Sequence, residues 1–132
     1  MDDLIRLCDI RKMKTELEIS KIQKTLDELS DILQQQINKY NKIFSNKQLF
    51  QLKIKELLKT TLVKRDFFYS NTAKITAFDK QIHKALKKKN KIMEQIREQE
   101  VLLDREKLIL RTLIVKKEKY NYMIDYYNEE CE

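Results

Sequence analysis

Residues 19–33, ISKIQKTLDELSDIL, decide how this chain folds. Their apolar side chains recur at alternating intervals of three and four residues, at Ile19, Ile22, Leu26, Leu29 and Leu33. These intervals keep one face of an α-helix apolar and leave the other faces polar. The stretch therefore predicts a helix that packs lengthwise against another helix.

The same heptad frame extends along the whole chain of 132 residues, with position a at Ile5 and position d at Cys8. We call the a and d positions of this frame the seam. Of 37 seam positions 26 are apolar, compared with 42% of the chain as a whole. The chain has no glycine, proline or tryptophan, and 37% of its residues are charged. Hairpin turns and phosphate-binding loops favour or require glycine, so β-sheet and Rossmann-type folds are excluded.

The seam is weakest near the chain midpoint, where Thr61, Lys64 and Asn71 replace apolar residues. Thr60 and Ser70 supply turn and capping chemistry there. We therefore expect an all-α fold, a long antiparallel two-helix coiled-coil hairpin. It forms a single domain over 1–132, with helices at about 3–58 and 73–130 and a turn region at about 59–72.

The heptad phase continues without a slip through 61–71, so one unbroken helix in a parallel dimer remains an alternative. The hairpin is expected to be monomeric, with its register centred near residue 66. Cys8 would then lie opposite about residue 124, too far from Cys131 for a disulfide, so both thiols are expected to be free.

The net charge of +7 conceals a division along the chain. Residues 37–93 contain 15 basic and 3 acidic side chains, whereas the remaining residues contain 13 basic and 18 acidic ones. The hairpin would therefore have a basic turn end and an acidic-leaning terminal end. Either this is an ordinary solvated surface or the two ends meet different partners.

Apolar side chains outside the seam form two further groups. All five phenylalanines lie between residues 44 and 78, where they either pack the turn end or form a docking patch. A second stripe near the N-terminus either widens the buried face or binds a third partner; it consists of Leu4, Leu7, Ile10, Met13 and Leu17.

Catalytic and metal-binding patterns do not emerge from the sequence. His83 is the single histidine, and clustered zinc ligands and a Ser-His-Asp arrangement are missing, so we expect no enzyme activity, metal or cofactor. A lysine run at 84–91 lies within the seam rather than before it, unlike a basic-region zipper, and we expect no nucleic acid partner. Residues 108–115 form the longest apolar run, well short of the ~20 needed to span a bilayer. With no signal peptide evident, we expect a cytoplasmic protein.

The chain resembles the central-stalk family of type III secretion ATPases, the YscO/FliJ-like proteins. The likeness rests on its size, its helical hairpin pattern and short motifs at both ends, namely Ile10-Arg11-Lys12, Lys116-Lys117-Glu118-Lys119, Met123, Asp125 and Tyr126-Tyr127. This resemblance implies paired termini inserted into the pore of a hexameric ATPase at the cytoplasmic base of a secretion apparatus. The turn end would face the export gate, and export chaperones would be further partners.

Two sets of contact residues follow from that resemblance. The ATPase contacts would be a basic collar of Arg11, Lys12, Lys116, Lys117 and Lys119. The gate or chaperone contacts would be an apolar and aromatic patch with a lysine rim, formed by Ile37, Tyr40, Phe44, Phe67, Phe68, Lys42 and Lys47. Two other functions remain open from the residues themselves: a coiled-coil chaperone of prefoldin-like shape, and a structural spacer.

Overall fold

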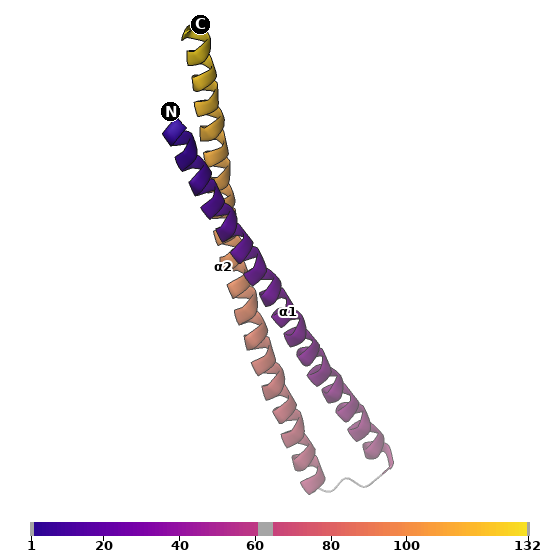
Figure 1. Cartoon of the computed structure of the whole chain (residues 1–132). Coiled ribbons are helices and arrows are strands. Elements are labelled where there is room, and N and C mark those ends of the chain that lie inside the picture. Colours follow the sequence, from indigo (N-terminus) through magenta and orange to yellow (C-terminus); the bar gives the residue numbers. More distant parts are fainter. Residues whose placement is uncertain (1, 61–64, 132) are drawn as a thin grey trace. The chain divides into compact units, whose positions relative to one another are not determined.

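The computed structural model describes residues 2–60 and 65–131, with side chains over 2–59, at 67 and over 69–129. These residues form two helices, α1 (Asp2–Thr60) and α2 (Arg65–Cys131) (Figure 1). The predicted all-α fold is confirmed. Helix α2 begins earlier than the sequence indicated, because 65–72, assigned to the turn, are helical. The remainder of the predicted cap chemistry, at 61–64, lies outside the described residues.

The chain divides into two compact units, each of which contains a segment of both helices. We call Met1–Glu28 together with Ile96–Glu132 the terminal unit, and Leu29–Gln95 the middle unit. The two helices run antiparallel within each of them. In the middle unit, Gln36 contacts Ala85 and Lys47 contacts Asp79, so the partner residue number falls as the position along α1 rises.

Contacts in the terminal unit follow the same antiparallel order. Lys117 of α2 contacts Asp9 of α1, and the earlier α2 residue Thr112 lines one groove with the later α1 residue Thr15. The antiparallel two-helix hairpin is therefore confirmed, and the parallel alternative does not describe this fold.

The seam holds almost every side chain that is shielded from water. Among the described side chains, those that are buried or half-buried outside the seam are Asp9, Thr25, Ile37, Leu86 and Met93. The heptad frame thus identifies the contact face of both helices, because a spacing of three and four residues returns to the same side of each helix.

Burial within this seam is shallow. Cys8, Ile22, Ala85 and Leu113 are the buried apolar residues among those described, and none of the described side chains is less than 2% exposed. Thr15 is the buried polar residue, and its hydroxyl donates to the carbonyl oxygen of Arg11 at 2.9 Å. That hydrogen bond satisfies the hydroxyl within its own helix, so a polar residue is tolerated at this seam position.

The register of the helix pair differs from the expected one. Lys47 and Asp79 lie equally far from residue 63 along the chain, as do Asp9 and Lys117. The expected centre near residue 66 was therefore wrong by about three residues. In the terminal unit, Cys8 lies opposite about residue 118 rather than 124, and it is a buried free thiol. The side chain of Cys131 lies outside the described residues.

Candidate functional site

A groove between α1 and α2 in the terminal unit is lined by three cationic side chains together with apolar ones. Arg11 and Lys14 come from α1, and Lys116 comes from α2. The groove has a volume of about 500 Å³ and is completed by Thr15, Leu108, Ile109, Thr112 and Leu113. We call it the basic groove. Its mixture of cations and apolar carbons suits an acidic surface that also offers apolar side chains.

The structure brings together two of the five residues of the predicted collar. Arg11 and Lys116 lie in the basic groove, while Lys12 is half-buried in the seam and Lys119 is exposed on α2. Lys117 pairs with Asp9 across the helices, with 2.6 Å between Nζ and Oδ1. Lys117 therefore has an acidic neighbour on α1 that the collar prediction did not include.

Lys14 was missed by the sequence reasoning. It lies three residues after Arg11, so the two side chains emerge on the same side of α1. Nothing in its own heptad position distinguishes it from other surface lysines. Only the register between the helices, which brings Lys116 beside it, identifies Lys14 as part of the groove.

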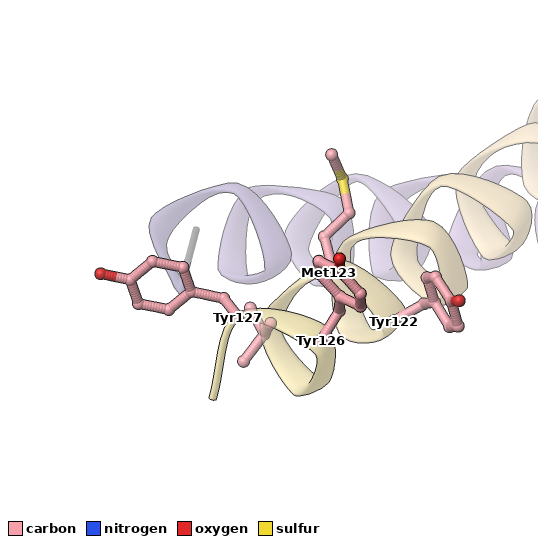
Figure 2. Close-up of a pocket in the computed structure, with 5 residues that line it drawn as sticks. Tyr122, Met123, Tyr126 and Tyr127 are labelled. Carbon is pink, nitrogen blue, oxygen red and sulfur yellow. The ribbon is translucent and has the colours of Figure 1, made fainter. Parts of the chain in front are cut away.

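The last turns of α2 form a second, aromatic groove in the terminal unit. It has a volume of about 490 Å³, and α2 alone supplies its lining of Tyr122, Met123, Ile124, Tyr126 and Tyr127. Figure 2 shows Tyr122 and Tyr127 pointing in opposite directions, with Tyr126 and Met123 between them. These turns extend past the first residue of α1 (Figure 1). Tyr127, expected in the seam, is 67% exposed because no described residue of α1 lies opposite it.

The second stripe of α1 is exposed. Its members, Leu4, Leu7, Ile10, Met13 and Leu17, are all between 43% and 64% exposed. The interpretation that this stripe widens the buried face was therefore wrong. Ile10, Met13 and Leu17 lie across the helix from the seam and present apolar carbon to the surroundings of the terminal unit.

The predicted aromatic patch is only partly assembled in the middle unit. Tyr40 and Phe44 stack on one face of α1, with ring centroids 6.2 Å apart and an interplanar angle of 18°. Ile37 and Tyr40 are half-buried, and Phe44 is exposed. Three residues from the prediction thus do share one helix face.

The remaining predicted patch residues lie elsewhere. In the register of the middle unit Phe67 is opposite about residue 59, roughly 22 Å along the axis from Phe44 at 1.5 Å per residue. Lys47 is half-buried and is paired with Asp79 at 2.5 Å, whereas Lys42 is exposed. Phe44 and Phe67 therefore do not adjoin in this register. The side chain of Phe68 lies outside the described residues.

The sequence reasoning also missed an aromatic contact between the helices of the middle unit. Phe50 and Phe78 meet with centroids 5.7 Å apart, and the Lys74 amine lies 5.6 Å from the centroid of the Phe50 ring. Ala77 and Gln81 complete a small groove beside them. Both phenylalanines are seam residues, so this contact is explained by packing.

Comparisons of this chain with protein families, curated proteins and solved structures find no match. Within the described residues no group of three or more His, Cys, Asp or Glu side chains is placed to hold a metal ion. Neither helix, over the same residues, contains a stretch long and apolar enough to cross a membrane. The candidate site is the basic groove, with the exposed apolar and aromatic surfaces of the terminal unit beside it.

Proposed function

We propose that this chain is the central stalk of a type III secretion ATPase. In this function the terminal unit enters the pore of the hexameric ATPase and stimulates ATP hydrolysis. The middle unit contacts the export gate, and export chaperones are further partners. The protein acts at the cytoplasmic base of the secretion apparatus and carries out no chemistry itself.

The observation that supports this proposal most directly is the basic groove. Arg11, Lys14 and Lys116 concentrate positive charge on a terminal unit that otherwise leans acidic. A ring of identical subunits presents the same surface to the stalk from several directions. Long, flexible lysine side chains tolerate such a mismatch in symmetry, because they make point contacts rather than fixed bidentate ones.

The exposed apolar surfaces of the terminal unit support the same proposal. Aromatic side chains anchor protein interfaces, and Tyr122, Tyr126 and Tyr127 all lie uncovered near the end of α2. The more basic residues 37–93 offer a surface of opposite charge balance, which suits a second partner of different charge.

The deciding experiment has two stages. The tagged chain is first used to recover partners from a cytoplasmic lysate, with a hexameric ATPase as the expected partner. The purified ATPase is then assayed with the wild-type chain and with an Arg11→Glu, Lys116→Glu double variant, which should lose most of the stimulation. Lys117 is left intact, because reversing its charge would also break its pair with Asp9.

A matched control reverses two exposed lysines of the middle unit, Lys42 and Lys53, and should leave stimulation unchanged. Suppressed aggregation of unrelated proteins without any ATPase partner would instead identify a chaperone. A chain that neither stimulates an ATPase nor protects other proteins would be a spacer.

A further inference from the structure

The outer face of α2 in the terminal unit carries an apolar stripe with a strict repeat of seven residues. Its members are between 51% and 72% exposed and are Val101, Leu108, Val115 and Tyr122. All four occupy position f, across the helix from the seam. Exposed Leu102 and Ile109 lie at position g, beyond position c on the same side of the helix. We call Val101, Leu108, Val115 and Tyr122 the outer stripe.

A repeat of this kind is unusual on a face that meets only water. Position f of a two-helix coiled coil is ordinarily polar, since it points away from the partner helix. Apolar residues seven apart line up along one side of a helix, which is the arrangement that packs against a further helix. The outer stripe therefore indicates that a further helix packs against this face of α2.

The charges beside the outer stripe indicate which helix this is. Position b follows one side of the stripe with regularly alternating signs, at Arg97, Asp104, Arg111 and Glu118. Position c follows the other side, at Glu98, Arg105, Thr112 and Lys119. When a helix packs against its own copy in the antiparallel direction, each side meets the same side of the copy. The charges on each side of the stripe must therefore be complementary to the same charges in reverse order if the partner is a second copy.

A two-fold axis beside Leu108 makes these charges complementary. Leu108 then meets the second copy's Leu108, and Val101 meets the second copy's Val115. On the b side Asp104 lies opposite Arg111 and Arg97 opposite Glu118, while on the c side Glu98 lies opposite Lys119. Each pair occurs twice by symmetry. Lys107, which would meet its own copy, lies at the margin of the face, where its amine reaches water.

Moving the axis by half a heptad, to between Leu108 and Val115, reverses the outcome. Asp104 would then lie opposite Glu118, Arg111 would meet its own copy, and Arg105 would lie opposite Lys119. Like charges in these positions disfavour that register. The charge pattern therefore favours the axis at Leu108 over the axis between Leu108 and Val115.

We propose that the free chain dimerises through the outer stripe of α2, antiparallel and with its two-fold axis at Leu108. The terminal units of two chains then form a four-helix assembly. This replaces the monomer expected from the sequence, and it goes beyond the proposed function because it involves no ATPase. Every measurement below uses the purified chain alone, so its failure is separate from failure of the stalk proposal.

Sedimentation equilibrium over low to high micromolar concentration tests the dimer. The wild-type mass should rise from the 16.1 kDa of one chain towards twice that value. Leu108→Lys should weaken dimerisation at least ~10-fold, since it places two charges at the centre of the contact. Met13→Lys is the matched control, because Met13 and Leu108 are both 64% exposed in the same unit, and it should have no effect.

Charge exchange tests the register. Asp104→Arg and Arg111→Asp should each weaken the dimer by about fivefold, because each places like charges together twice. The double variant restores the pairs with their signs exchanged and should recover wild-type dimerisation. Circular dichroism checks that every variant keeps its helix content.

Crosslinking tests the position of the axis, in a background with Cys8→Ala and Cys131→Ala. Leu108→Cys should form a disulfide with its own copy, whereas Val115→Cys should form one only when mixed with Val101→Cys. The proposal is overturned by a chain that stays monomeric throughout, by a dimer insensitive to Leu108→Lys, or by a double charge exchange as weak as the single variants. Val115→Cys crosslinking to itself would equally reject this register.

Discussion

Lys117 of α2 reaches across the terminal unit to Asp9 of α1, leaving 2.6 Å between its Nζ atom and the Oδ1 atom. This pair joins a seam lysine to a residue beside the seam of the other helix. It explains how a charged residue occupies position a, where an unpaired amine would lose hydration without compensation. It also fixes the relative height of the two helices in this unit.

The ion pair should contribute modestly to stability. We expect a double-mutant cycle with Asp9→Asn and Lys117→Met to give a coupling of about 0.5–1 kcal/mol at low salt, because the two side chains are 45% and 35% exposed. High salt should largely remove the coupling. Urea unfolding followed by circular dichroism measures it. Lys119→Met, on the same helix, is the control, and a coupling of similar size between Asp9 and Lys119 would contradict the assignment.

Ala85 should tolerate enlargement poorly. It is 5% exposed, and its carbonyl oxygen accepts a hydrogen bond from Gln36 at 3.4 Å. Ala85→Leu should lower the free energy of unfolding by about 1–3 kcal/mol, because the helices must separate to admit the larger side chain. Ala73→Leu, at an exposed position on α2, should change it by less than about 0.5 kcal/mol. Equal effects of the two substitutions would mean that the helices are not packed at Ala85.

Cys8 should react slowly with alkylating reagents in the folded chain. Its side chain is 7% exposed and it is a free thiol. In a Cys131→Ser background, labelling should be at least ~10-fold slower in native buffer than in denaturant, because the thiolate must reach solvent to react. Mass spectrometry over time gives both rates. Rapid labelling in native buffer would show that the helices separate readily at Cys8.

The two predicted gate phenylalanines should act independently. Phe44→Ala removes the ring that stacks on Tyr40 and should weaken binding of the gate or a chaperone at least ~10-fold. Phe67→Ala should have less than about a twofold effect, because the ring lies far along the axis from Phe44. Leu49→Ala is the matched control, being an exposed apolar residue of the same helix segment. Titration of the purified partner measures binding, and an equal loss in both variants would restore the single patch.

The sequence predicted the contact faces of both helices because burial follows a short, regular interval. It could not predict the register, since the heptad patterns of the two helices match equally well after one helix slides along the other by seven residues. The centre of the register lies about three residues from the expected one, so a different residue of α2 lies opposite Cys8. The candidate site depends on this register. Without the register, Asp9 was not known to lie opposite Lys117, and Lys117 was assigned to a contact with a partner protein. Lys14 was overlooked because Lys116 was not known to lie beside it.

Surface residues outside the seam were harder still to interpret. The stripe around Ile10 and Met13 gave two interpretations, and only the position of α2 shows that it is uncovered. Phe44 and Phe67 were assigned to one patch because both are aromatic and both lie in the turn-end half of the chain. Neither property places two side chains close together in space. Contact faces are a local property of each helix, whereas sites are a property of how the two helices are aligned.

The register also sets the order in which the chain folds. Lys47 and Asp79 are 32 residues apart in sequence, whereas Asp9 and Lys117 are more than three times as far apart. Closing the longer loop first would cost about 1 kcal/mol more in chain entropy. Contacts between the nearer residues therefore form early, and each one shortens the loop that the next must close. Contacts between the helices therefore form in order from the middle of the chain towards its two ends. The terminal contacts form last and break first.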